Sequence, residues 1–306
     1  MKEKELLKEI EALKDTNKAL VGLKKKFAPV KIRKRDRIKS ESTLFLVASD
    51  WHIEERVNPK TVNYLNEFNL QIAEQRVDAL WNNSVKLLEI FERDTEIKDI
   101  VVCLIGDFIT GSIHEENLAT NAVKPMEAIW KAQNLIAGGL ELLKQTGRKV
   151  HVICKSGNHA RTTKKVHMDG EYGNSLETFM YLNLAKQFPE FRWQIDESYH
   201  SYITVYDKVI RIHHGHFVRY GGGVGGIYIP MNKAIAQWNK SYNAHLNING
   251  HFHNKLDGGN FVSNGSLIGY NAFAVSIKAE MEAPQQTAFL FDKVHQKTIV
   301  APIFLQ

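Results

Sequence analysis

The sequence has few cysteines and no long apolar run. Among its 306 residues are only two cysteines and no continuous apolar run of the roughly 18 residues that a membrane-spanning helix needs. The N-terminal residues are charged throughout and lack the apolar segment of a secretory signal. Cys103 and Cys154 lie in strand-like apolar runs, where we expect buried thiols in a reducing compartment rather than a disulfide framework. We therefore expect a cytoplasmic protein that does not enter a membrane.

The excess of positive charge is confined to the start of the chain. Residues 1–40 contain 14 Lys and Arg against 6 Asp and Glu, whereas the remaining 266 residues contain 26 against 28. Any attraction to a polyanion would therefore come from the first segment alone. We accordingly divide the chain into a basic extension, residues 1–40, and a body, residues 41–306. An apolar content of 43% is sufficient for a buried core in the body.

The basic extension has the spacing of a helix with an apolar seam. Steps of four and three residues connect Leu6, Ile10, Leu13, Asn17, Leu20, Lys24 and Phe27. This alternation is typical of a parallel two-stranded coiled coil in which one Asn fixes the register. An amphipathic helix lying on the body, or a frayed charged tail, would produce the same pattern. A homodimer through residues 3–27 is thus one of three interpretations.

A run of basic residues follows this helix. Pro29 ends the helical pattern, and six of the nine residues from Lys31 to Lys39 are Lys or Arg. Such a run suits a phosphate backbone, because binding releases counterions. A solvated linker is the equally acceptable alternative.

Apolar runs in the body predict buried parallel strands at residues 43–48, 100–105 and 149–154. Helical patterns at 61–92 and 117–145 lie where the crossovers between such strands are required. Additional helices are predicted at 173–188 and 230–242, and additional strands at 201–206, 209–213, 246–249, 259–263, 272–277, 286–291 and 297–304. We expect the last sixty residues to form a second sheet of largely antiparallel strands.

Polar residues follow each of the first three strands. Asp50 and His52 come after the first strand, Asp107 after the second, and Asn158 and His159 after the third. Ligands of open α/β sheets bind at this edge of the sheet. Oxygen and imidazole nitrogen atoms are suitable ligands for a divalent ion.

Histidines are concentrated in two short clusters. Five of the thirteen histidines lie in the segments His213–His216 and Gly250–His253, and each segment follows a β-rich run. A lone histidine would be interpreted as a core residue, but imidazoles presented at strand ends are what a metal site requires. A glycine-rich segment at 221–226 lacks the Lys-Ser/Thr ending of a nucleotide-binding P-loop.

Taken in chain order, these residues resemble the signature of a known superfamily. The five segments Asp50–His52, Gly106–Asp107, Gly157–His159, His214–Gly215 and Gly250–His253 resemble the motifs of the calcineurin-like metallophosphoesterases, over residues 43 to about 255. The resemblance implies an α/β fold with a two-sheet β-sandwich flanked by helices, here preceded by an N-terminal helical extension. Within this superfamily, the body of the chain resembles stand-alone phage or bacterial phosphoesterases, some of which are exonuclease-like.

The resemblance also implies a site for two divalent ions, with Mn²⁺ the first choice and Fe, Zn²⁺ or Mg²⁺ chemically admissible. The implied ligands are Asp50, His52 and His253 for the first ion, Asn158, His214 and His251 for the second, and Asp107 as the bridge. In this scheme Asp50 and His159 are the catalytic candidates. His159 would contact the phosphate or the leaving oxygen as an acid or an electrostatic stabiliser.

Two further residues are candidates for substrate binding. His216 would face the substrate, or would replace His214 as the metal ligand. Arg161 would clamp a phosphate, or would make only a surface salt bridge. The segments Phe108–Gly111 and Ala160–Arg161 lack the Asp-Arg-Gly and Glu of protein Ser/Thr phosphatases in this superfamily, which argues against a phosphoprotein substrate.

These features predict a metal-dependent phosphodiesterase that acts on nucleic acid. The nucleic-acid part of the prediction rests on Lys31–Lys39 and on Lys164 and Lys165 near the site. A small-nucleotide phosphodiesterase or phosphomonoesterase is the alternative, which the slight negative charge of the body favours. A metal-free scaffold is disfavoured, because no ligand of the implied set is missing.

Overall fold

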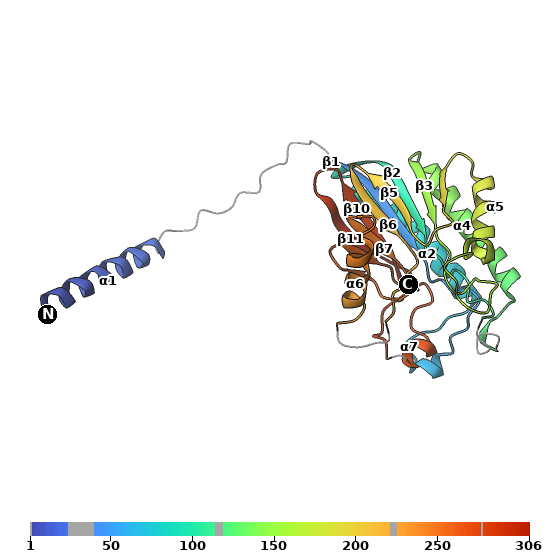
Figure 1. The fold of residues 1–306 in the computed structure, drawn as a ribbon, viewed down its shortest axis with the longest axis horizontal. Helices are drawn as coiled ribbons and strands as arrows, with labels where there is room; N and C mark the ends of the chain where they lie inside the picture. The colour runs from blue at the N-terminus through green and yellow to red at the C-terminus, as the bar shows by residue number, and fades with distance from the viewer. Residues whose placement is uncertain (1, 24–39, 114–118, 221–224, 277) are drawn as a thin grey trace. The chain divides into compact units, whose positions relative to one another are not determined.

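A computed structural model describes residues 2–23, 40–113, 119–220, 225–276 and 278–306 (Figure 1). The chain forms two compact units, Met1–Ile38 and Lys39–Gln306. In the first unit the described residues form one helix, α1 (Lys2–Leu23). The basic run Lys31–Lys39 and the predicted seam beyond Leu23 lie outside the described residues.

Two sheets form the centre of the second unit. The first has the order β11-β10-β1-β2-β3-β4, with the bounds β1 Ser40–Ala48, β2 Thr95–Leu104, β3 Lys149–Cys154, β4 Arg192–Ile195, β10 Gln285–Asp292 and β11 Gln296–Phe304. The second has the order β5-β6-β7-β9-β8, with the bounds β5 Ser201–Val205, β6 Lys208–Ile212, β7 Leu246–Asn249, β8 Leu256–Asp257 and β9 Phe261–Ser263. Strands β1 to β4 are parallel, as are β6, β7 and β9.

Helices cover the outer faces of both sheets. They are α2 Leu70–Phe91, α4 Pro125–Gln145, α5 Leu176–Gln187 and α6 Tyr228–Trp238. The short helix α7 Ala272–Ser276 lies beside the 3₁₀ turn η1 Pro59–Val62, and a second 3₁₀ turn, η2, spans Tyr172–Asn174. Figure 1 shows α4 and α5 on one side of the sheets and α6 on the other. No helix in the described part of the chain is long and apolar enough to cross a bilayer.

The alternation of side chains along β1 explains this layered arrangement. Leu44 and Leu46 point into the core shared with α2, α4 and α5, whereas Phe45 and Val47 point into the core between the two sheets. Both faces of β1 are therefore buried, which accounts for its unbroken apolar sequence. The predicted two-sheet sandwich flanked by helices is confirmed, and both cysteines are buried free thiols.

Two of the predicted strand assignments are wrong. The last two strands do not enter the second sheet, because β10 pairs antiparallel with β1 and β11 pairs with β10. The β-like run at 272–277 contains helix α7, whose start is capped by Asn271, since its Oδ1 atom accepts a hydrogen bond from the Ala274 amide at 3.0 Å.

Candidate metal centre

Loops that leave five parallel strands meet at one edge of the sandwich. They follow β1, β2 and β3 of the first sheet and β6 and β7 of the second. Backbone hydrogen bonds join neighbouring loops: the Asp50 amide donates to the Gly106 carbonyl at 2.9 Å, and the Gly250 amide donates to the His214 carbonyl at 2.8 Å. The His251 amide also donates to the Asp50 carboxylate at 3.0 Å, which links the two sheets. Segments distant in the sequence are thus fixed against one another.

The backbone at this edge is unusual. Five side-chain-bearing residues have left-handed backbones: Asp50 (φ 56°), His52 (φ 48°), Asp107 (φ 54°), His251 (φ 72°) and His253 (φ 53°). This conformation costs about 1–2 kcal/mol per residue for an ordinary L-amino acid. Its concentration at the residues that the sequence singled out marks the edge as a functional site.

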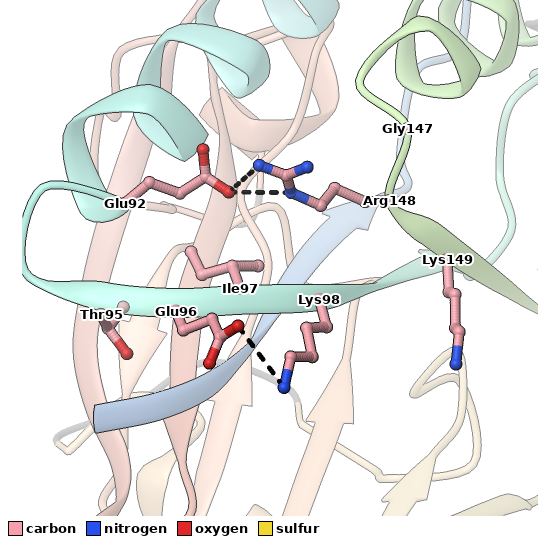
Figure 2. Close-up of a pocket in the computed structure, with 8 residues that line it drawn as sticks. All are labelled: Glu92, Thr95, Glu96, Ile97, Lys98, Gly147, Arg148 and Lys149. Carbon is pink, nitrogen blue, oxygen red and sulfur yellow. Dashed lines mark hydrogen bonds and ion pairs between the residues drawn. The ribbon is translucent and has the colours of Figure 1, made fainter. Parts of the chain in front are cut away.

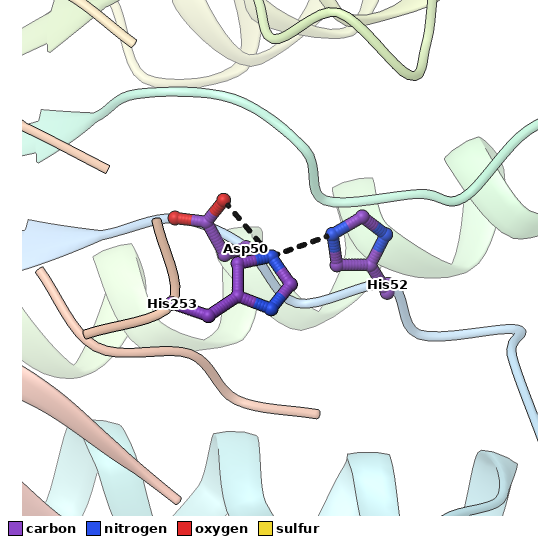
Figure 3. Close-up of side chains that lie close together, drawn as sticks. All are labelled: Asp50, His52 and His253. Atoms are coloured by element: carbon purple, nitrogen blue, oxygen red, sulfur yellow. Dashed lines mark hydrogen bonds and ion pairs between the residues drawn. The ribbon is translucent and has the colours of Figure 1, made fainter. Parts of the chain in front are cut away.

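The first cluster consists of Asp50, His52 and His253 (Figure 3). The Nε2 atoms of His52 and His253 lie 3.2 Å apart, and His253 Nε2 lies 3.5 Å from Asp50 Oδ1. Ligand atoms bound at about 2.1 Å to one ion are roughly 3 Å from each other, so this spacing fits a shared cation. His52 is oriented by a contact of 3.2 Å between its Nδ1 atom and Thr110 Oγ1.

The second cluster consists of Asp107, His214 and His251, whose ligand atoms lie within 4.8 Å of one another. His214 Nδ1 donates to the Ile105 carbonyl at 2.7 Å, and this bond turns Nε2 toward Asp107 Oδ2 at 2.9 Å. Asp107 is also grouped with His52 and His159, again within 4.8 Å. The Asp107 carboxylate therefore lies between the two clusters, where it could bridge two ions.

An unpaired polar atom and two close approaches show that the residues fit metal ions. Asn158 Oδ1 is buried and has no hydrogen-bond partner in the described structure. A Cβ atom on Gly157 would lie 2.1 Å from Asp107 Oδ1, and one on Gly250 would lie 2.5 Å from Asp50 Oδ2. Both glycines are thus required by the close approach of a carboxylate. The mixture of imidazole, carboxylate and amide donors suits a divalent cation.

The charges of these groups depend strongly on one another. Burial would raise the pKa of Asp107, but His214 and His159 outweigh it and hold that pKa well below its ordinary value. Burial would lower the pKa of His214, but Asp107 outweighs it and raises the pKa to about 10. Burial and neighbouring histidines hold the pKa values of His52 and His251 well below the ordinary value, which keeps both imidazoles in the neutral form that binds metals.

The predicted catalytic histidine, His159, is half-buried beside the clusters. His159 Nδ1 donates to the Thr110 carbonyl at 3.0 Å, and its amide donates to Asp107 Oδ1 at 2.8 Å. Its ring lies 4.8 Å from the ring of His52, measured between centroids. The Nδ1 bond fixes the ring, so Nε2 is the atom that can exchange a proton with a bound substrate.

The two predicted substrate-binding residues are engaged with the protein itself. The Arg161 guanidinium donates to the carbonyls of Asn158, Thr163 and Lys164. His216 is nearly buried, and its Nε2 atom lies 3.1 Å from Glu171 Oε1. His213 is buried against the rings of Tyr199, His200 and Trp238.

Sequence analysis did not identify Glu177, a fully buried residue of α5. Its Oε1 atom accepts the Phe108 amide and its Oε2 atom accepts the Gly157 amide, each at 2.8 Å. Glu177 therefore holds the loop after β2 to the loop after β3. Burial, followed by the charge of Asp107, raises the pKa of Glu177 to about 8. No local pattern could have revealed this role, because its partners are 69 and 20 residues away in the sequence.

Two hollows differ in their relation to the clusters. A cavity of about 60 Å³ adjoins the site and is lined by Asn158, Arg161, Thr163, Val166, His167, Asp169, Gly170, Glu171 and Asn174. A larger surface hollow of about 420 Å³ lies at the opposite ends of β2 and β3, where Arg148 donates to Glu92 (Figure 2). Since the candidate ligands follow the carboxyl ends of these strands, the larger hollow is not part of the metal centre.

Comparisons with known proteins agree with this arrangement. The sequence model of the calcineurin-like phosphoesterase family matches residues 43–255 of the chain. A search of curated proteins finds no match.

Several solved structures resemble the chain at low sequence identity. The hypothetical protein PH1004 from Pyrococcus horikoshii is 15% identical, with 85% of this chain and 87% of that chain covered and a TM-score of 0.40. A Vps29 single mutant from Entamoeba histolytica is 14% identical, with 85% and 97% covered and a TM-score of 0.32. The sulfate thiohydrolase SoxB from Thermus thermophilus is 10% identical, with 90% and 58% covered and a TM-score of 0.34. Because the family model spans most of the body and contains every candidate ligand, the chain belongs to the calcineurin-like phosphoesterase family.

Proposed function

We propose that the protein is a dinuclear-metal-dependent phosphodiester hydrolase that acts on nucleic acid. The observation that carries the proposal is the completeness of the ligand set. Asp107 lies between two clusters of ligand atoms, and the amide oxygen of Asn158 has no partner in the described structure. When bound, two divalent ions would neutralise the charge of a phosphate and lower the pKa of a water nucleophile.

The protein's own residues would orient the substrate and supply the proton for the leaving group. Asp50 and Asp107 hold the two clusters at a fixed separation, because each carboxylate accepts a backbone amide, from His251 and His159 respectively. His159, fixed by the Thr110 carbonyl, would donate a proton from Nε2 to the leaving oxygen. Proton donation of this kind contributes about 10²–10⁴-fold to a rate.

Positive charge near the site supports a polyanionic substrate. Lys164 and Lys165 are exposed, and Arg161 anchors their loop to Asn158 by donating to carbonyls at both places. The run Lys31–Lys39 would add a second region for phosphate contacts. A small-nucleotide substrate is the second candidate, favoured by the slight negative charge of residues 41–306.

A comparison of substrates tests the proposed reaction. With Mn²⁺ we expect turnover of bis-para-nitrophenyl phosphate in preference to the monoester. Asp107→Ala should lower that turnover by about 10³-fold or more through loss of the bridging ligand. His159→Ala should lower it by about 10²–10⁴-fold with the bound metal retained, as measured by elemental analysis. Asp99→Ala and His245→Ala, which alter exposed residues, are the matched controls. Equal activity of Asp107→Ala and Asp99→Ala would refute the metal-dependent mechanism.

Salt dependence separates the two substrate classes. Cleavage of single-stranded or duplex DNA should fall steeply as salt rises from about 50 to 200 mM, because phosphate contacts release counterions. Turnover of the small diester should change little over the same range. A small diester that is turned over while neither DNA is cleaved would leave the hydrolase standing and reject the nucleic-acid substrate.

A further inference from the structure

Helix α1 presents an apolar face that the described structure leaves exposed. Leu6, Ile10, Leu13 and Leu20 are each between 44% and 63% exposed, although these side chains lie on one side of the helix. A face of this kind is unfavourable in water and is characteristic of a helix that binds a partner.

The spacing of the residues along this face indicates which kind of partner the helix binds. Leu6, Ile10, Leu13, Asn17 and Leu20 follow one another in steps of four and three residues, which is the 3.5-residue repeat of a left-handed coiled coil. Helices that lie on a globular surface have no need of this strict repeat. The pattern therefore favours another helix with the same repeat as the partner.

The identities of the seam residues favour a coiled coil of two parallel helices. With Leu6, Leu13 and Leu20 at the d positions, Ile10 and Asn17 occupy a positions. A β-branched residue at a combined with Leu at d favours a two-stranded parallel coil. Asn at a single a position pairs with its copy across the seam and penalises other registers and larger assemblies.

The charges beside the seam agree with this choice. In the same register Glu9 is at a g position and Lys14 is at the following e position. In a parallel dimer the g position of one helix lies beside the following e position of the other helix. Glu9 of each helix would therefore lie beside Lys14 of the other, on both sides of the seam. An antiparallel pair places g beside g and e beside e, and does not form this contact.

We propose that α1 binds α1 of a second copy of this chain as a parallel two-stranded coiled coil. The 22 residues of α1 supply about three heptads, the minimum for such an assembly. The partner surface is thus provided by the chain itself, and the proposal does not depend on the proposed catalytic activity.

The oligomeric state of the full chain tests the proposal. Sedimentation equilibrium at micromolar concentration should give twice the 34.9 kDa mass of the chain. Leu13→Lys places a charge in the seam and should weaken dimerisation at least tenfold. Asp15→Lys places the same side chain only two residues further along, on the outer face of the helix, and should leave the dimer intact. A monomeric wild-type chain, a larger oligomer, or equal masses for the two variants would each overturn the proposal.

A cross-linking experiment tests the orientation. Leu6→Cys lies near one end of α1, so only a parallel dimer brings the two introduced thiols together. Cys103 and Cys154 are buried and should not contribute. We expect a reducible dimer band on a denaturing gel after mild oxidation of Leu6→Cys, and no such band for the outward-facing control Lys8→Cys. Absence of the band from a chain that sediments as a dimer would reject the parallel arrangement.

Discussion

Glu177 provides the sharpest test of how the body positions its candidate metal ligands. Its carboxylate is fully buried and accepts the amides of Phe108 and Gly157, which are adjacent in sequence to Asp107 and Asn158. Above the Glu177 pKa of about 8 both of its oxygens are acceptors, whereas Gln retains one acceptor oxygen and turns an NH₂ group toward the other amide. One buried N–H then loses its partner, at a cost of about 1–3 kcal/mol. In a domain of this size each 1 kcal/mol lost from the free energy of unfolding lowers Tm by about 2–4 °C, so we expect Tm to decrease by roughly 2–12 °C.

The same change should affect the metal centre more than the fold. Residues that orient metal ligands typically alter metal affinity or activity by about 10–100-fold when replaced, so we expect Glu177→Gln to weaken Mn²⁺ binding by that factor. Calorimetric titration with Mn²⁺ and thermal unfolding of the same samples measure the two effects. Glu141→Gln, an isosteric change at an exposed position of α4, is the control. Wild-type affinity and Tm in Glu177→Gln would refute the assigned positioning role.

Three further outcomes follow from the geometry of the site. In Gly157→Ala the new Cβ atom would lie 2.1 Å from Asp107 Oδ1, so we expect Mn²⁺ affinity to fall at least tenfold. Calorimetric titration measures this, and Gly138→Ala, where a Cβ atom contacts nothing within 4 Å, should bind Mn²⁺ as the wild type does. Arg161→Lys should lower kcat about tenfold with little change in KM if Arg161 positions Asn158, whereas a rise in KM alone would indicate substrate contact instead. Mn²⁺ at about 100 times its Kd should stabilise the body by about 2.7 kcal/mol relative to the EDTA-treated protein; identical melting curves in the two conditions would contradict metal binding.

Much of the site was evident from the sequence, because its residues follow strands with a strong local signal. The apolar run of β1 is buried on both faces, and Asp50 and His52 come directly after it. Since parallel strands end at the same edge, a list of strand-end residues becomes a list of neighbours in space. The structure brings Asp50, His52 and His253 together as that argument expects.

The errors arose where local patterns compete with longer-range contacts. Helix α2 starts at Leu70 rather than near residue 61, because Asn69 caps it and Asn63 and Tyr64 have left-handed backbones. Strand β10 pairs with β1 across more than two hundred residues, which no local periodicity encodes. Glu177 was missed for the same reason, since its importance lies in amides that other loops supply.

The left-handed backbones of five candidate ligands set a limit on how the protein can be engineered. Glycine adopts that conformation without steric strain, so exchanging one of the three histidines for glycine would relieve local strain while removing a donor to the metal. At Asp50 and Asp107 the same exchange would also leave a backbone amide without its acceptor. Selection for heat resistance alone would therefore reward inactive variants, and a programme of directed evolution would have to screen for turnover at every round. Thermal robustness and hydrolytic competence are, at the three histidine positions, opposing objectives.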